Sequence, residues 1–93
     1  DTIWNNHIIA VTVGYDTNGN PSEVFANAAT GGAMQATIAD ACILISIALQ
    51  HGVLPADLGK SLATVPEYIN GDLTDAPASP VGAIIGIVLE VMI

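Results

Sequence analysis

Apolar and polar residues alternate near the start of the chain as they do in a β-hairpin. Residues 7–15 are rich in β-branched side chains that point alternately to two faces, which is typical of a strand. The Asn18-Gly19 pair lies in the segment that follows, and such a pair tolerates the positive φ angles of a tight turn. Residues 22–28 have the composition of a second strand. The sequence therefore predicts an antiparallel hairpin here.

The longest apolar segment predicts a helix over residues 33–50. The polar residues within it are Gln35, Thr37, Asp40, Ser46 and Gln50. A helix that is apolar on nearly every face is normally enclosed by other elements, so we expect this helix to be enclosed. The His51-Gly52 pair follows it, and the glycine is suited to ending the helix.

Two further helices are predicted toward the C-terminus. Residues 55–62 begin with a proline, which suits the first turn of a helix. Residues 81–93 follow a Ser79-Pro80 pair, which suits an N-cap and the first helical position. Between these helices, residues 67–78 are rich in Asn, Gly, Asp, Thr and Pro. We expect a loop of about a dozen residues there, and it is the best candidate for a mobile segment.

These elements predict one small α+β domain over residues 1–93, in which a β-hairpin is followed by two to three helices. A lone hairpin is marginal in water and leaves two unpaired edges. Unless residues 1–6 add a third strand, this small antiparallel sheet must be extended by a neighbouring copy. We therefore expect a homodimer.

The composition supports a partner for a second reason. The chain has 93 residues, of which 52% are apolar and 11% are charged. A domain of this size hides only about two-thirds of the surface that its unfolded chain exposes. Its single core is too small to absorb all of this apolar surface, so a second copy or another protein should cover some of it.

The charge of the chain is strongly negative. Nine acidic residues oppose Lys60 alone, and the formal net charge is −8. Nucleic acids and anionic membranes attract proteins through Lys and Arg, so neither is an expected partner. No uninterrupted apolar stretch reaches the roughly 18 residues of a membrane-spanning helix. Cys42 permits no internal disulfide and no export signal opens the chain, so we expect a cytoplasmic protein.

No pattern of residues indicates catalysis, a metal site or a cofactor. The Cys and His residues show neither CxxC nor HxxxH spacing. Cys42 lies in an apolar run with no histidine within one helical turn, so it is expected to pack as a small hydrophobic side chain. An interaction with the last carbonyl groups of the helix explains His51 better than metal ligation does. The sequence therefore predicts a protein that is not an enzyme.

Asp40, the Gly31-Gly32 pair and His51 are candidates for a ligand site or an interface. Asp40 lies within an apolar helix, so it must be paired, hydrogen-bonded or at a surface edge. Thr37, one turn earlier, is a candidate partner, and an exposed stripe is the favoured interpretation. The Gly31-Gly32 pair before the helix could leave backbone N–H groups free to hold an anion. No GxGxxG pattern and no nearby Lys or Arg completes a phosphate site, so a simple turn of the chain is favoured there.

Four segments stand in an order that is similar to that of a known family. They are Val11-Thr12-Val13-Gly14 with the Asn18-Gly19 turn, Pro21 to Asn27, Ile45 to Val53, and Ser79 to Ile85. Together they resemble the TSCPD-type domain, which is found near the C-terminus of adenosylcobalamin-dependent (class II) ribonucleotide reductases and in small stand-alone proteins. The resemblance spans residues 8–93.

The resemblance implies an accessory module that helps to assemble or regulate a nucleotide-reducing enzyme. The Cys-Pro-Asp element of the family name is missing here, as are the cysteine pairs that often follow the domain. No metal-binding or redox role of those cysteines is therefore implied. Reductase activity is not implied either, because its radical chemistry needs a large barrel, several cysteines and a cobalamin site.

Two hypotheses of function follow, and an enzyme that uses Asp40 or His51 is the least favoured third. The first is an interaction or assembly domain that works as a homodimer and has a ribonucleotide reductase subunit as a candidate partner. The alternative is a small-ligand module that binds a nucleotide or anion at Gly31-Gly32, with residues 67–78 as a lid. An exposed Asp40 beside a large apolar surface would favour the first hypothesis. A buried Asp40 that lines a cavity would favour the alternative or the enzyme.

Overall fold

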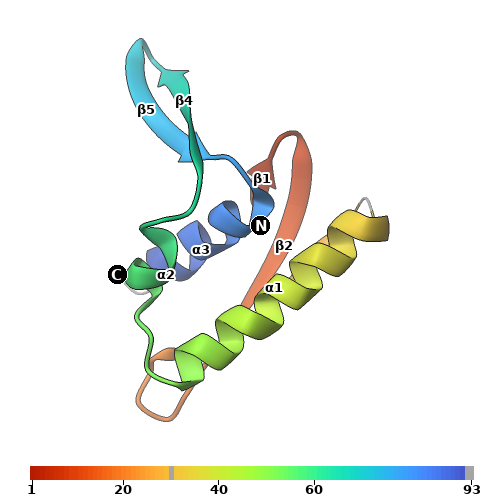
Figure 1. The fold of residues 1–93 in the computed structure, drawn as a ribbon, viewed down its shortest axis with the longest axis vertical. Coiled ribbons are helices and arrows are strands. Elements are labelled where there is room, and N and C mark those ends of the chain that lie inside the picture. Colours follow the sequence, from red (N-terminus) through yellow and green to blue (C-terminus); the bar gives the residue numbers. More distant parts are fainter. Residues whose placement is uncertain (30, 92–93) are drawn as a thin grey trace.

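The computed structural model describes residues 1–29 and 31–91 and shows an α+β architecture of two antiparallel sheets and three helices (Figure 1). The predicted fold class is confirmed. In chain order the elements are β1 (Thr2–Trp4), β2 (His7–Tyr15), β3 (Pro21–Ala28), α1 (Gly32–Gln50), α2 (Pro55–Gly59), β4 (Thr64–Ile69), β5 (Asp72–Pro77) and α3 (Pro80–Glu90).

The larger sheet has three strands in the order β1-β2-β3. Its third strand, β1, comes from the first six residues, so the chain itself extends the predicted hairpin. Asn5 and Asn6 have φ angles of 48° and 64°, which fit the two-residue turn between β1 and β2. β1 pairs with β2 only along His7 to Ile9. A neighbouring copy is therefore not needed to supply a third strand.

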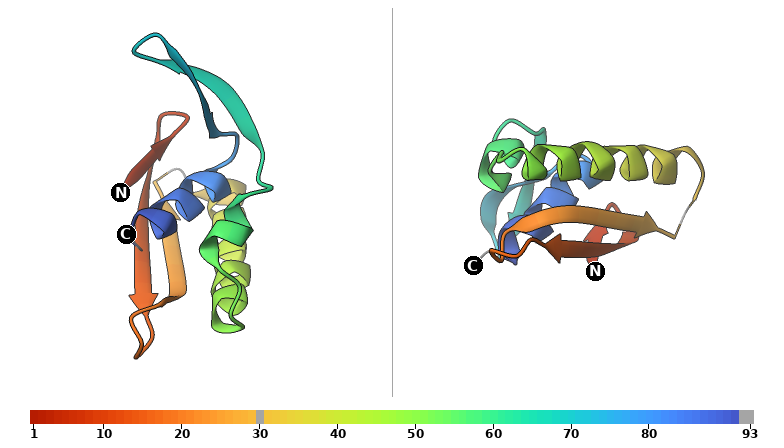
Figure 2. Two further views of the ribbon diagram at one scale, coloured as in Figure 1. Left: turned by 90° about the vertical axis from the view of Figure 1, so that its left-hand side faces the viewer. Right: turned by 90° about the horizontal axis from the view of Figure 1, so that it is seen from below.

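Both α1 and α3 lie on the same face of this sheet, and α1 runs along β3 (Figure 2). The buried side chains of α1 recur every three or four residues and form one stripe, which consists of Ile38, Cys42, Ile45 and Leu49. The opposite side of α1 is exposed. The expectation that other elements enclose this helix is therefore wrong, because the small sheet and the short α3 cover only one side of it.

The core lies between the sheet and the two longer helices. Its most completely buried side chains are less than 2% exposed, and they are Ile9, Val24, Ile38, Ile84 and Val88. They come from β2, β3, α1 and α3, so one cluster joins the elements that are far apart in the sequence. Losing any of these aliphatic side chains would leave a cavity at the junction of sheet and helices.

Side chains of α1 hydrogen-bond the outer edge of β3. The Ser46 hydroxyl accepts from the backbone N–H of Val24 at 2.9 Å. The Gln35 amide accepts from the N–H of Ala28 at 2.6 Å and donates to the carbonyl of Ala26 at 3.1 Å. An unpaired strand edge invites pairing with another strand. Here the backbone groups that another strand would need are already occupied, so β3 is a closed edge.

The Gln50 side chain continues this pattern by donating to the Ser22 carbonyl at 3.1 Å. Gln35, Ser46 and Gln50 of the apolar helix therefore all hydrogen-bond the backbone of β3. Their spacing along α1 places them over the edge of β3, and the burial of the helix stripe holds them there.

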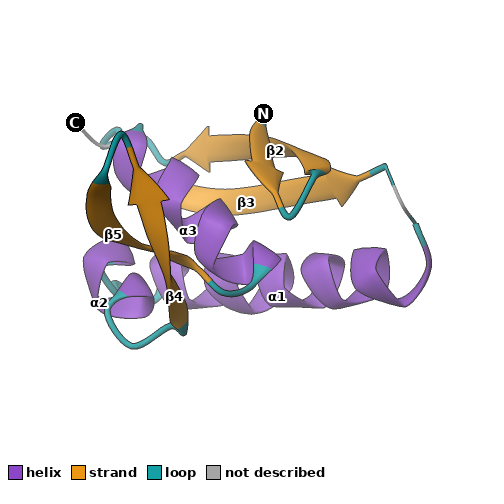
Figure 3. Cartoon of the chain, turned by 90° about the horizontal axis from the view of Figure 1, so that it is seen from above, coloured by secondary structure: helices purple, strands orange, loops and turns teal. Residues whose placement is uncertain are grey.

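Both predicted C-terminal helices are present, but α3 ends at Glu90 and the last predicted helical residues, 92–93, lie outside the described residues. The Ser79 hydroxyl accepts from the N–H of Gly82 at 3.3 Å, so the predicted N-cap of α3 is confirmed. α2 ends at Gly59, earlier than predicted, and lies beside α3 (Figure 3). A Cβ atom at Gly59 would approach Ile85 Cγ2 to 3.0 Å, so the two helices meet closely where α2 ends.

The prediction of a loop over residues 67–78 is wrong. β4 and β5 pair there as a second antiparallel hairpin, from the Thr64–Pro77 pair to the Ile69–Asp72 pair. Asn70 and Gly71 form its turn with φ angles of 51° and 85°, which a type I′ turn requires. Figure 1 shows that this hairpin projects away from the rest of the domain. We call residues 64–77 the arm.

The closed edge of β3 can be tested with a Ser46→Ala variant. This change leaves the partly buried N–H of Val24 without its acceptor, which should lower the free energy of unfolding by about 1–3 kcal/mol. The matched control is Thr37→Ala, because the Thr37 hydroxyl only donates to the Ala33 carbonyl of its own exposed helix turn. The control should change stability by less than about 0.5 kcal/mol.

Chemical denaturation followed by circular dichroism measures both values. Alanine favours helix at both positions, so the difference in helix propensity largely cancels between the two variants. Equal stabilities of Ser46→Ala and Thr37→Ala would show that the contact to β3 contributes nothing to the fold.

Candidate interaction surface

The residues that the sequence singled out do not come together. Gly31 is the N-cap of α1 and Gly32 is its first residue. Asp40 lies near the middle of the helix, and His51 is its C-cap. A helix of 19 residues is roughly 28 Å long at 1.5 Å per residue, so its two ends cannot share one small-molecule site. The structure therefore offers no single pocket built from these residues.

The two glycines turn the chain from β3 into α1. Their φ angles are 62° and 65°, in the region that side chains other than glycine rarely adopt. The N–H of Gly31 donates to the Ala28 carbonyl at 3.4 Å, so part of the backbone at this turn is already hydrogen-bonded. These observations account for the glycines without a ligand.

Asp40 is exposed on the outer side of α1. Thr37, the candidate partner of Asp40, donates its hydroxyl to the Ala33 carbonyl instead. In the described part of the chain, the one ion pair joins Lys60 to Asp57 at 3.5 Å between two exposed side chains. Asp40 therefore belongs to an exposed stripe, as the favoured interpretation held.

His51 is also exposed, and its backbone contacts the end of α1. The main-chain N–H donates to the carbonyls of Ile47 at 3.1 Å and Ala48 at 3.2 Å. Within residues 1–29 and 31–91, no group of three or more His, Cys, Asp or Glu side chains could hold a metal ion.

The outer face of α1 is the most continuous apolar helix surface. We use this name for the exposed residues Ala36, Ala39, Asp40, Ile43, Leu44 and Ile47. The side chains of Ile43, Leu44 and Ile47 are 58%, 68% and 48% exposed. Large apolar side chains gathered on one exposed face mark interaction sites in soluble proteins. Asp40 lies among them, so the face is apolar with one carboxylate.

A shallow groove adjoins this face, between α1 and the closed edge of β3. It has a volume of about 400 Å³, and its lining includes Phe25, Ala39, Cys42, Ile43 and Ile47. Gln35 and Ser46 also line it, but their polar atoms are engaged by the backbone of β3. The groove therefore offers mainly apolar contact.

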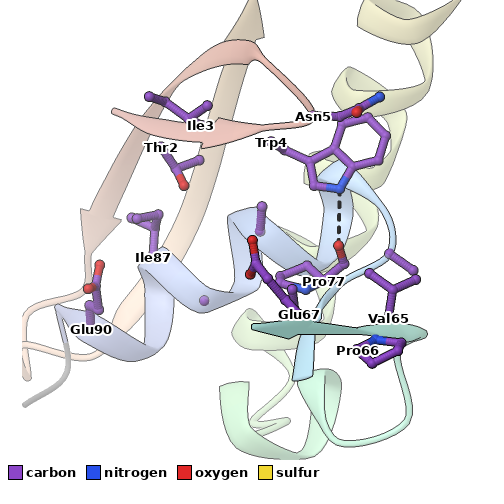
Figure 4. A pocket seen from close by; sticks show the side chains of 14 residues that line it. Thr2, Ile3, Trp4, Asn5, Val65, Pro66, Glu67, Pro77, Ile87 and Glu90 are labelled. Atoms are coloured by element: carbon purple, nitrogen blue, oxygen red, sulfur yellow. Dashed lines mark hydrogen bonds between the residues drawn. The ribbon is translucent and has the colours of Figure 1, made fainter. Parts of the chain in front are cut away.

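A second hollow separates the arm from β1 and α3, with a volume of about 730 Å³. Trp4 and Pro77 form one end of it, where the indole Nε1–H donates to the Pro77 carbonyl at 3.1 Å (Figure 4). Glu67 and Glu90 also line it. The base of the arm is thus fixed to β1, while the rest of the arm stands clear.

The side of the sheet that faces away from the helices is also partly apolar. Ile3 and Ile8 lie directly opposite each other on β1 and β2 and are 70% and 56% exposed. Phe25 on β3 is 58% exposed. Ile3 and Ile8 provide a reference for the outer face of α1, because they are similarly exposed and do not line the groove beside α1.

One further property of α1 concerns membranes. By length and composition alone the helix could cross a bilayer, since its 19 residues contain an 18-residue window with a mean hydropathy of 1.7. Core helices of soluble proteins pass the same test, although here only 22% of the window is buried. The exposed apolar area of α1 is therefore unusual for either a core helix or a surface helix.

Sequence reasoning found α1 but missed the arm and the direction in which Ile43, Leu44 and Ile47 point. The Asn70-Gly71 pair was the available signal for the arm, since Asn-Gly between apolar residues is the strongest local mark of a hairpin. No local signal distinguishes the buried stripe of α1 from its exposed face, because both are aliphatic.

The comparisons with known proteins agree with the resemblance found in the sequence. The model of the TSCPD domain family matches residues 2–92, which is essentially the whole chain. No curated protein and no solved structure matches the chain significantly.

Cys42 provides a test of the packing beneath the groove. The thiol is 3% exposed, and burial raises its pKa, while a hydrogen bond from the Ala26 backbone opposes this shift. We expect slow reaction with a thiol-specific reagent at mildly alkaline pH and fast reaction after unfolding in denaturant. Because the pKa is higher in the folded state, stability should fall as the pH rises above the ordinary thiol pKa of about 8.5.

Absorbance of the released chromophore follows the labelling, and thermal melts across the alkaline range follow the stability. A Cys42→Ser variant removes the titrating thiol and should flatten the alkaline fall. Rapid labelling of the folded protein would contradict a thiol packed between α1 and β3.

Proposed function

This chain belongs to the TSCPD domain family, and we propose that it is a non-catalytic accessory domain that acts through protein–protein interaction. TSCPD domains are associated with proteins related to ribonucleotide reductases. The proposed partner is a protein of that kind, and the outer face of α1 is the proposed binding surface. The observation that carries the proposal is the exposure of Asp40 within this apolar face.

The energetics favour a protein partner for this face. Fully burying a Leu or Ile side chain contributes about 1.5–3 kcal/mol, and Ile43, Leu44 and Ile47 are each about half exposed or more. A facing apolar surface would recover most of this free energy. Asp40 at the side of the same face can accept a hydrogen bond from a partner, which would fix the orientation of the complex.

A small ligand is less suited to this surface. Ligand sites use a few free polar groups to orient the ligand within an enclosed cavity. Within the described residues, every buried side-chain polar atom already has a hydrogen-bond partner. Asp40 lies on the exposed side of the helix and lines none of the cavities described above. The nucleotide or anion hypothesis used residues 67–78 as a lid. These residues lie mostly in the arm, a paired hairpin with its turn at Asn70 and Gly71.

A bilayer is also a poorer partner than a protein. Asp40 lies near the middle of α1, and a carboxylate at the centre of a bilayer costs about 2.5–3.5 kcal/mol on insertion scales. Leaving the domain would also break the hydrogen bonds of Gln35, Ser46 and Gln50 to β3. Lys60 is the single basic side chain, so attraction to anionic lipid headgroups is weak.

The proposal predicts the behaviour of an Ile43→Ser/Leu44→Ser variant. The test measures binding to a purified class II ribonucleotide reductase that has no TSCPD domain of its own. The wild-type chain should bind, and the variant should raise Kd by about tenfold to a hundredfold, as truncation of central apolar contacts does. Isothermal titration calorimetry gives both values.

The matched control is Ile3→Ser/Ile8→Ser, which removes two side chains of similar exposure from the outer sheet face. This control should bind like the wild type, and circular dichroism should show that both variants are folded. Unchanged binding by the α1 variant, equal losses in both variants, or no binding by the wild type would each contradict the proposal. Flotation with vesicles of neutral or anionic lipid, if it depended on Ile43 and Leu44, would assign the face to a membrane instead.

A further inference from the structure

The arm is exposed along almost its whole length. Every residue of β4 and all of β5 except Ala76 are exposed. Tyr68 and Leu73 are 75% and 61% exposed, although both are large and apolar or aromatic. Apart from the contact between its own strands, the arm meets the domain mainly through α3 and through the Trp4–Pro77 hydrogen bond.

A hairpin in this position lacks the support that other hairpins have. Two strands alone are marginally stable in water, and additional strands or a packed helix normally stabilise them. The Asn70-Gly71 turn and the six cross-strand pairs show that the sequence nevertheless specifies a hairpin. Its outer half, around Tyr68, therefore needs a surface to pack on.

The two most exposed apolar side chains of the arm form a cross-strand pair on one face, whereas Val65 and Ile69 lie on the other face. Tyr68 lies directly opposite Leu73, and on the same face the next pair is Pro66 with Asp75. Side chains that face each other in this way pack together and act as one unit. The Tyr68–Leu73 pair thus makes a compact apolar patch near the end of the arm.

The total surface of the chain is larger than a monomer of this mass requires. Its accessible area is 5906 Å², whereas the scaling of folded monomers gives about 5,000 Å² for 9.5 kDa. The radius of gyration is 13.4 Å, against about 12.3 Å for a compact chain of this length. The excess of roughly 900 Å² is close to the roughly 800 Å² that each partner contributes to a standard interface.

Because the arm is exposed along almost its whole length and contributes part of this excess area, we infer that it is a dimerisation arm, which packs its Tyr68–Leu73 patch on a second copy of this chain. In a two-fold dimer the same patch is used by both copies, so each arm would be covered once. The inference rests on the proposed function only in treating the chain as an assembly domain. It assigns a different surface from the outer face of α1.

The charge of the chain gives this dimer a recognisable property. Glu67, Asp72 and Asp75 lie on the arm, and each copy carries a formal charge of −8. Two copies repel each other at long range, and salt screens that repulsion. An apolar contact between two such chains should therefore tighten as the salt concentration rises. A basic partner on the same arm would be released by salt.

The experiment is sedimentation equilibrium of the whole chain over a wide range of protein and salt concentrations. The wild type should reach the mass of a dimer, with a Kd that falls as salt is added. A Tyr68→Ser/Leu73→Ser variant should weaken dimerisation at least about thirtyfold, as expected for side chains at the centre of an interface. The control is Ile8→Ser on the outer sheet face, where the side chain is 56% exposed and does not line the hollow beside the arm, and it should remain dimeric.

Hydrogen exchange of the wild type supplies a measurement that does not depend on the folding of a variant. Amides of residues 64–77 should exchange faster on dilution below the Kd, while those of α1 and β3 should not change. Three results would each overturn the inference: a monomeric wild type, an unchanged dimer Kd in the arm variant, or exchange rates of the arm amides that do not change on dilution. If the chain does not dimerise but still binds the reductase, the arm inference fails and the proposed function holds. If the chain dimerises through the arm but does not bind the reductase, the proposed function fails and the arm inference holds.

Discussion

The fold depends on the contact between one stripe of α1 and the strand β3. Ile38, Cys42, Ile45 and Leu49 pack on the sheet, and this packing places Ser46, Gln35 and Gln50 over the edge of β3, where their side chains bond its backbone. An amphipathic helix would normally turn its polar residues to solvent. Here several of them hydrogen-bond the backbone of β3 instead, so the exposed side of the helix is mainly apolar. The closed edge of the sheet and the open apolar face of α1 are thus two results of the same arrangement.

This arrangement restricts how the chain can associate with others. β3 cannot accept another strand without losing its bonds to α1, so pairing through that edge is disfavoured. β1 covers β2 only as far as Ile9, but β1 itself completes the three strands that a small sheet needs. The exposed apolar side chains available for association lie on the outer face of α1 and on the arm, among other places. These two surfaces differ in kind, since α1 is a rigid helix held by the core and the arm is a hairpin held at its base.

The sequence predicted the regular elements well wherever local chemistry decides them. The strand alternation of residues 7–15, the Ser79 N-cap and the glycine at the end of α1 all act over a few residues, and each is found as expected. The arm was not predicted, because the Pro, Asp and Thr residues around Asn70-Gly71 are typical of a loop and obscure the signal of the turn pair. The single buried stripe of α1 could not be predicted, since Ile45 and Leu44 differ in burial only through what packs on them. The candidate site was foreseen only in part: Asp40 was identified, but the apolar residues beside it were expected to be enclosed.

In residues 1–29 and 31–91, the reactive side chains that the sequence singled out lie apart from one another. Catalysis needs reactive groups that are held together and kept partly desolvated. In the described residues the buried reactive group is Cys42, whose pKa is raised by burial, so it is less ionised and less nucleophilic than an ordinary thiol. Asp40 and His51, in contrast, are exposed and stand roughly 16 Å apart along the rise of the helix. The free energy available at the surface of this domain is that of apolar burial, which drives association. The proposed role in protein–protein interaction would use this apolar free energy.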